Sequence, residues 1–400
     1  MKRCLFLFLV FGLAAGALHG QSADLYTYTS DHYRVGTDIS ESYARRVADK
    51  MEAALVLFND MLHFDLSQLS AQLKVTIFRN KAGFDEYLER TIDQSRENFV
   101  YIHYSDIRKS ELVGFNKEDI RDFDTSLLHQ GFIQLLKAFV PNPPIWFREG
   151  TATYLEQSIY DEDARAFEYR PNLLWLERIK SILSGRDESR RPIALSLLLT
   201  MDRDGLEEQL DVFYPQAWGM VTFLLETDDR RYGRIYWDAL NTLDPEKSLR
   251  ENSVAVMREV FSWYDESLMV KDFADYIMSI KTFNELVTEG VNSYTLEEYD
   301  EAADDFMRAV ELEPQNHIPY YYLGLISYAK KDYSRAEGYY KAALALGAGE
   351  AVTTYALGVN AFADNRFDVA TAYLLEAKEL DPVKYGEKVD SLLQRMEALR

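Results

Sequence analysis

Cysteine is nearly absent from this sequence of 400 residues, since the only cysteine is Cys4, close to the start of the chain. A single thiol forms no intrachain disulfide, and removal of the first residues would leave no thiol nucleophile. Proline is scarce as well, with 10 residues, whereas 47% of the chain is hydrophobic and 28% is charged. Fibrous and broadly disordered classes are therefore excluded. A chain of this length is expected to form two or three domains.

Positive charge is also in short supply. The chain has 44 Lys and Arg residues against 66 Asp and Glu residues, which gives a formal net charge of -22. A strongly acidic chain is repelled by nucleic acid and by anionic membrane surfaces. No basic cluster that could follow a phosphate backbone interrupts this pattern. We therefore expect no nucleic-acid partner.

Only one long hydrophobic run is present, and it lies at the N-terminus. Lys2 and Arg3 precede an apolar run over 4–18, and small side chains follow. This run is short for a membrane span and is typical of a secretory signal. We expect residues 1–20 to be a signal peptide, with Ala17 as a competing cleavage site, and the mature protein to be periplasmic, envelope-associated or secreted. The alternative is an uncleaved N-terminal anchor.

Residues 24–280 are predicted to form an α+β domain. Segments rich in Tyr, Thr and Val predict strands, and apolar residues at helical spacing predict helices. The predicted strands are 26–35, 73–78, 99–104 and 111–115. The predicted helices are 40–64, 84–88, 125–139 and 146–158, with others inside 211–240 and 253–280, and 185–192 is a polar loop.

Three consecutive repeats of equal length follow, at 283–316, 317–350 and 351–384. Small residues recur in phase, as Gly290, Gly324 and Gly358 and as Ala302, Ala336 and Ala370. This pattern over residues 283–382 resembles the tetratricopeptide repeat (TPR), a helix–turn–helix unit. The resemblance implies an all-α solenoid that binds proteins, and residues 385–400 would form its capping helix.

The resemblance also implies a groove. In this family, positions 2, 5, 9 and 12 of the first helix of each repeat face the concave side. Eleven of these twelve positions are apolar or aromatic here, and none is Lys or Arg. These expected partner-binding residues are Val287, Val291, Tyr294, Ile318, Tyr321, Leu325, Tyr328, Val352, Tyr355, Val359 and Phe362. Such a surface favours a protein or peptide partner that presents an apolar or amphipathic helix. The alternative is a structural envelope protein whose groove is filled by its own capping helix or preceding domain.

One stretch has the outline of a metal site. Residues 127–156 read LLHQGFIQLLKAFVPNPPIWFREGTATYLE, which resembles the peptidase MA-like (gluzincin) zinc proteases, as does the later YPQAW segment, 214–218. In that family, H-E-x-x-H supplies two zinc ligands and a general base, and a glutamate on the next helix is the third ligand. By this resemblance His129 and Glu149 occupy ligand positions. Gln130 replaces the catalytic glutamate, and Ile133 replaces the second histidine.

These two replacements remove the general base and one zinc ligand that peptide hydrolysis in that family requires. A neutral amide does not take a proton from water, and isoleucine has no lone pair for zinc. One imidazole and one carboxylate are too few ligands for a protein zinc site, and the chain has no H-E pair and no G-x-S-x-G. We therefore expect a gluzincin-like pseudo-peptidase domain followed by a TPR solenoid, with no catalytic residue, metal or cofactor. The alternative is a hydrolase with a non-standard site.

The purified protein should contain no stoichiometric zinc and should cleave no generic protein substrate, because by the resemblance Gln130 stands at the position of the general base and Ile133 at that of a zinc ligand. Elemental analysis and a protease assay measure these properties. About one zinc per chain that is lost in His129→Ala would contradict this prediction.

The mature protein should lack its first ~20 residues, because a charged and then apolar start directs export and cleavage. Mass spectrometry of the protein isolated from its native cell measures the mass directly. A chain that keeps Met1 and stays in the cytoplasm would show that the signal interpretation is wrong.

Overall fold

The computed structural model describes residues 25–399, so the expected signal peptide at 1–20 and Cys4 lie outside the described part of the chain. The described residues form two compact units. The first contains 25–139 and 160–167, and the second contains 140–159 and 168–399. Among these residues, no helix is both long and apolar enough to cross a membrane. The domain boundaries expected from the sequence stay predictions.

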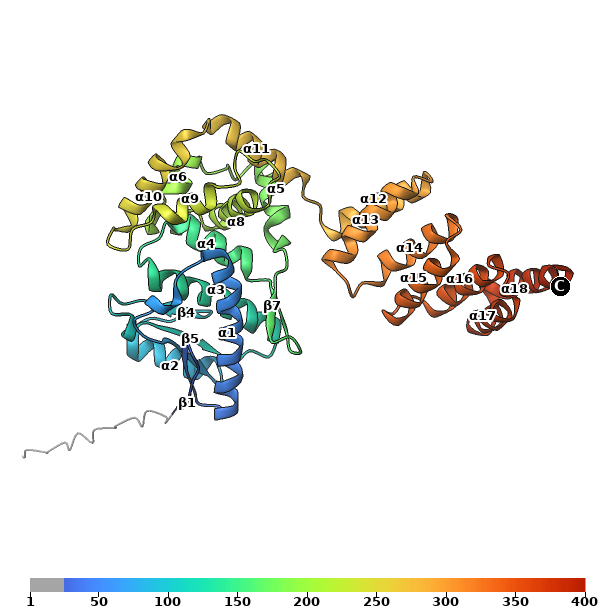
Figure 1. The fold of residues 1–400 in the computed structure, drawn as a ribbon, viewed down its shortest axis with the longest axis horizontal. Helices are drawn as coiled ribbons and strands as arrows, with labels where there is room; N and C mark the ends of the chain where they lie inside the picture. The colour runs from blue at the N-terminus through green and yellow to red at the C-terminus, as the bar shows by residue number, and fades with distance from the viewer. Residues whose placement is uncertain (1–24, 400) are drawn as a thin grey trace, which may run out of the picture. The chain divides into compact units, whose positions relative to one another are not determined.

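A five-stranded sheet with the order β1-β2-β3-β5-β4 forms the centre of the first unit (Figure 1). The inner strands β2, β3 and β5 run parallel, and each edge strand is antiparallel to its neighbour. The bounds are β1 Tyr26–Thr29, β2 Tyr33–Thr37, β3 Leu73–Phe78, β4 Val100–Ile102 and β5 Glu111–Phe115. Strands predicted at 73–78 and 111–115 are confirmed, and the one at 99–104 is shorter than predicted.

The single strand predicted over 26–35 is wrong, because the chain turns after Thr29 and forms the antiparallel pair β1 and β2. Glu52, on helix α1 (Glu41–Leu62), holds this turn. Its Oε1 accepts hydrogen bonds from Ser30 Oγ at 2.7 Å and from the His32 backbone N at 2.8 Å. The turn therefore depends on a carboxylate that is distant in sequence.

Three helices pack with the sheet: α1, α2 (Lys81–Ile92) and α3 (Ile120–Phe139). Ser40 caps α1 by accepting a hydrogen bond from the Tyr43 backbone N, which fixes the start that the sequence predicts. Helices α1 and α3 are joined by Lys50, whose Nζ lies 2.7 Å from each oxygen of the buried Asp124 carboxylate. Removing either partner would leave an uncompensated buried charge. Short elements missed by the sequence reading are 3-10 helices at Leu66–Gln68 and Ile107–Lys109 and the hairpin β6 Ile159–Asp161 with β7 Ala166–Glu168.

Apart from the terminal residues of β6 and β7, the regular elements of the second unit are helices. Before the repeats they are α4 Ile145–Leu155, α5 Leu176–Leu183, α6 Leu195–Thr200, α7 Arg203–Glu208, α8 Leu210–Glu226, α9 Ile235–Thr242, α10 Leu249–Glu259 and α11 Glu266–Ser279, with 3-10 turns at Leu173–Trp175 and Phe261–Trp263. Helices α4 and α8 cross closely at Gly150, where an added Cβ would lie 2.6 Å from the Ala217 carbonyl oxygen. The glycine that follows Glu149 is thus a packing requirement.

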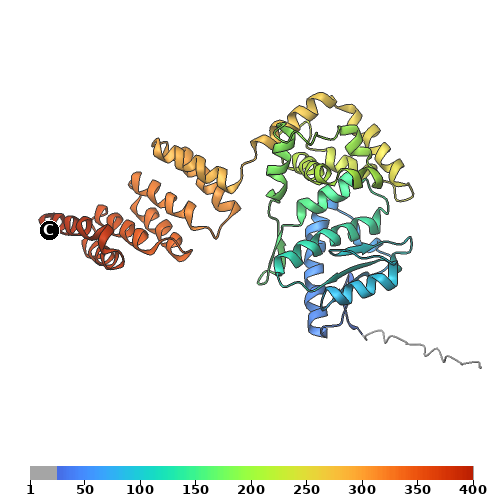
Figure 2. The same ribbon diagram turned by 180° about the vertical axis from the view of Figure 1, so that it is seen from behind.

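The repeats form three helical hairpins and a final helix, which fit a TPR solenoid (Figures 1 and 2). The helices are α12 Phe283–Thr295, α13 Tyr299–Leu312, α14 His317–Ala329, α15 Tyr333–Ala345, α16 Glu350–Ala363, α17 Phe367–Leu380 and α18 Pro382–Leu399. The turn within each hairpin has one residue in the left-handed region: Glu297 (φ 62°), Lys331 (φ 63°) and Asn365 (φ 59°). These residues are spaced by one repeat length, so the backbone repeats with the sequence.

Each hairpin needs a glycine where its two helices cross. A Cβ at Gly324 would lie 2.5 Å from the Tyr340 ring, and one at Gly358 would lie 2.7 Å from the Leu374 side chain. Gly324→Ala should therefore lower the free energy of unfolding by about 1–3 kcal/mol, as overpacked cores do. Chemical denaturation followed by far-UV circular dichroism measures this change.

Gly338→Ala is the matched control, because an added Cβ there meets no atom within 4 Å. It lies within α15 and should stabilise the helix by up to about 1 kcal/mol. Equal effects of the two substitutions would refute the close crossing at Gly324.

Candidate functional site

The first helices of the hairpins, α12, α14 and α16, hold all the predicted groove residues, and each of these side chains is half-buried. All of them except Ile318 also pack on a hydrophobic cluster, as Val287 and Tyr294 do against the cluster of Phe306 and Leu323. The groove residues therefore have a structural role as well as an accessible surface. The full set is Val287, Val291, Tyr294, Ile318, Tyr321, Leu325, Tyr328, Val352, Tyr355, Val359 and Phe362.

Four tyrosines of this set have rings that contact other aromatic rings and hydroxyls that make no hydrogen bond within residues 25–399. They are Tyr294, Tyr321, Tyr328 and Tyr355. The Tyr321 ring lies 5.9 Å from that of Tyr340, centroid to centroid, and the other three rings contact neighbouring tyrosines. Burial raises the pKa of all four phenols, so they remain neutral and can donate.

The capping helix α18 covers part of the third repeat. Tyr385 stacks on Tyr355 with ring centroids 4.6 Å apart, and the Arg395 guanidinium lies 5.7 Å from the centroid of Phe362. Tyr385, Val389 and Met396 share a core with the third hairpin. Substitutions at Tyr355 therefore affect the packing of the solenoid end as well as its surface.

In the first unit, the positions that the resemblance assigns to zinc chemistry have structural contacts. Gln130 Oε1 accepts a hydrogen bond from the Tyr101 backbone N of β4 at 3.0 Å. Ile133 is buried, with 7% of its surface exposed. Gln134 Nε2 donates to the Lys74 carbonyl of β3 at 2.8 Å. Together they attach α3 to the sheet, and His129, half-buried, stands on the same helix.

In the second unit, Glu149 is buried on α4 beside a cation. The Arg148 guanidinium donates to its Oε1, with Nε at 2.8 Å and Nη2 at 2.6 Å. Burial, followed by the charge of Glu149, raises the pKa of the Tyr214 phenol on α8. Within residues 25–399, no group of three or more His, Cys, Asp or Glu side chains is arranged to hold a metal ion.

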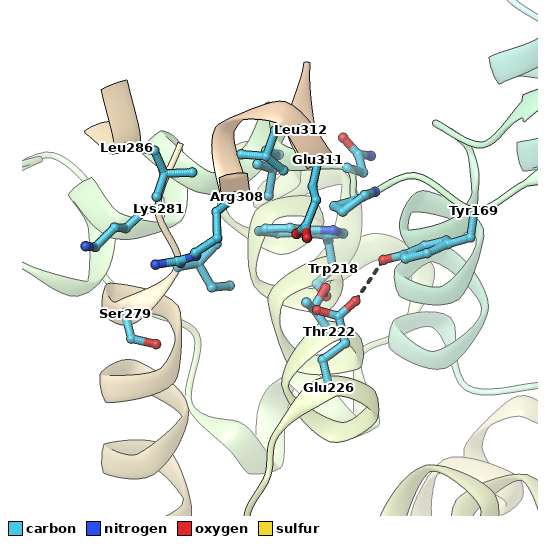
Figure 3. Close-up of a pocket in the computed structure, with 14 residues that line it drawn as sticks. Tyr169, Trp218, Thr222, Glu226, Ser279, Lys281, Leu286, Arg308, Glu311 and Leu312 are labelled. Atoms are coloured by element: carbon cyan, nitrogen blue, oxygen red, sulfur yellow. Dashed lines mark hydrogen bonds between the residues drawn. The ribbon is translucent and has the colours of Figure 1, made fainter. Parts of the chain in front are cut away.

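The second unit also contains a pocket of about 380 Å³ that the sequence did not predict (Figure 3). Its lining comes from α8, α12, α13 and the segments 169–173 and 279–281. The one sequence signal was Trp218, the last residue of the YPQAW segment. The other lining residues are scattered from 169 to 312, and no spacing rule joins them.

No protein-family model and no curated protein matches the chain. Among solved structures, it is similar to the first TPR of Spaghetti (RPAP3) bound to an HSP90 peptide, SRMEEVD (20% identity, 29% of this chain and 91% of that chain, TM-score 0.28). It is also similar to the Yersinia enterocolitica type III secretion translocator chaperone SycD (20% identity, 30% of this chain and 96% of that chain, TM-score 0.28). The first TPR domain of human RPAP3 is a third such structure (21% identity, 29% of this chain and 95% of that chain, TM-score 0.26).

Proposed function

We propose that this chain is an exported, non-catalytic protein that binds a protein partner through the groove of its repeats. The observation that carries the proposal is the set of four half-buried groove tyrosines with hydrogen-bond-free hydroxyls. Their rings are already ordered by packing, so a partner that covers them loses little side-chain entropy on binding. Tyrosine is also among the residues enriched at interface hot spots.

The acidic charge of the repeats limits the class of protein that the groove can bind. Residues 283–382 contain 18 Asp and Glu side chains against 7 Lys and Arg, and no groove position is cationic. A surface of this kind disfavours an acidic peptide and attracts a basic one. We infer an amphipathic helix with an apolar face for the groove and basic residues for its rim.

We infer that the segment 24–280 is a pseudo-peptidase, a domain that keeps a peptidase fold without catalytic activity. This part of the proposal rests on the resemblance around His129 and Glu149 and on the structural contacts of Gln130 and Ile133. A glutamine bonded to a strand and a buried isoleucine have roles that do not need zinc. A hydrolase with a non-standard site would need another ligand set or nucleophile.

Tyr321→Ala should weaken capture of the partner by roughly 2 kcal/mol or more, as truncation of a central interface aromatic does. Tyr355→Ala should do the same. Both variants should lower the unfolding temperature less than loss of a fully buried aromatic would, because Tyr321 packs on Tyr340 and Tyr355 stacks on Tyr385 but all four groove tyrosines are only half-buried. Pull-down from an envelope fraction, beside thermal unfolding of the free protein, separates binding from stability.

Tyr321→Phe and Tyr339→Ala are the matched controls. The first removes only a hydroxyl without a hydrogen bond and should leave the unfolding temperature nearly unchanged. The second truncates a half-buried tyrosine on α15, a second helix, and should leave capture intact. A self-filled groove would behave differently: both groove alanine variants would cost about 3–5 kcal/mol of stability, as buried aromatics do, and no partner would be lost.

A further inference from the structure

The pocket in Figure 3 has an aromatic and aliphatic interior and a charged rim. Trp218 of α8 lies at its centre, and Leu286 of α12 and Leu312 of α13 supply apolar walls. Its volume, about 380 Å³, falls within the range of small-molecule sites. It shares no residue with the groove or with the positions that resemble a zinc site.

One buried donor in this pocket has no acceptor. Trp218 is 1% exposed, and its Nε1–H has no hydrogen-bond partner among residues 25–399. A buried N–H without a partner costs about 1–3 kcal/mol. The other buried polar side chains of the lining are satisfied: Asn172 donates to the Thr153 carbonyl at 2.7 Å, and Thr222 donates to the Trp218 carbonyl at 2.9 Å. The indole N–H is therefore the buried polar group of the lining that lacks a partner within residues 25–399.

The rim carries a fixed anion at Glu226. Its Oε1 accepts hydrogen bonds from the hydroxyls of Tyr154 at 2.9 Å and Tyr169 at 2.8 Å, and its Oε2 accepts one from Tyr276 at 3.2 Å. Burial raises the pKa of all three phenols, so they keep their protons and donate. Three donors hold the carboxylate in one place, which is the preorganisation that binding of a cation requires.

Two further rim charges lie on α13. Glu311 is exposed and makes no hydrogen bond or ion pair with any residue of 25–399. Arg308, one helical turn before it, has only Asp305, at 3.9 Å, as a carboxylate partner within the described chain. Lys281 is already paired with Glu289 and lies 3.6 Å from Asp305. Arg308 is therefore the cation best able to accept a new anion.

We propose that this pocket binds a short apolar peptide with free amino and carboxyl ends. The ammonium group pairs with Glu226 and Glu311, and the carboxylate pairs with Arg308. The peptide carbonyl accepts the hydrogen bond of Trp218 Nε1, and the apolar side chains pack on Leu286 and Leu312. A zwitterion fits because both signs of charge stand on one rim around an apolar interior.

Isothermal titration calorimetry of the full-length protein with three probes tests the proposal. Leucyl-leucine should bind saturably with one site per chain. N-acetyl-leucyl-leucine lacks the ammonium group and leucyl-leucinamide lacks the carboxylate, so each should bind at least about 10-fold more weakly. Absence of saturation by leucyl-leucine up to about 10 mM, or equal binding of all three probes, overturns the proposal.

Variants assign each end of the ligand. In Arg308→Gln, leucyl-leucine should bind about 10-fold more weakly and no better than its amide, because the charge that reads the carboxylate is gone. In Glu311→Gln, the preference for the free amine over the acetylated probe should shrink. Arg335→Gln and Glu379→Gln, exposed residues outside the pocket, should change neither preference. Unchanged preferences in both pocket variants overturn the proposal.

Trp218→Phe keeps an aromatic ring and removes the orphan N–H, and it should weaken leucyl-leucine binding several-fold while both end preferences remain. Because Trp218 is buried, circular dichroism must first show that this variant is folded. Arg308→Gln and Glu311→Gln change exposed side chains, so their binding preferences test the proposal even if the tryptophan variant does not fold.

Discussion

The repeat region depends on the close crossing of two helices at a glycine. In the second hairpin the Tyr340 ring occupies the space that a Cβ of Gly324 would need. Lys331, in the turn before α15, adopts a left-handed backbone. A side chain at the crossing would push the helices apart, and the next hairpin packs on the surface that this crossing sets. The predicted groove residues of this repeat lie on α14, one of the two helices that cross here.

The groove tyrosines show how one residue serves both packing and surface. Tyr321 contributes its ring to the cluster around Tyr340 and Leu357, while its hydroxyl has no hydrogen bond within residues 25–399. An aromatic ring that is half-buried is positioned by its packing contacts. The proposed groove would therefore be a preformed surface, whereas a row of flexible side chains would have to be ordered by a partner.

The sequence predicted these repeats closely because their information is local and periodic. Glycine, alanine and aromatic residues recur once in every repeat, and the turns and crossings recur with them. Contacts distant in sequence were not predictable in this way. The turn between β1 and β2 depends on Glu52, and the pocket brings Tyr169, Trp218 and Arg308 together from three separate segments. No periodicity marks such residues, because each owes its place to tertiary packing.

The two positions on α3 that the proposed resemblance assigns to zinc chemistry, 130 and 133, differ in their structural contacts. The acceptor that Tyr101 needs is supplied by the Gln130 amide oxygen at 3.0 Å, and a glutamate carboxylate would supply it equally well. Ile133 is different, because a histidine there would place two ring nitrogens in a site that is 7% exposed and now filled by an apolar side chain. A buried imidazole without partners costs free energy. In the proposed pseudo-peptidase, a second histidine at position 133 would therefore meet a packing barrier that a glutamate at position 130 would not.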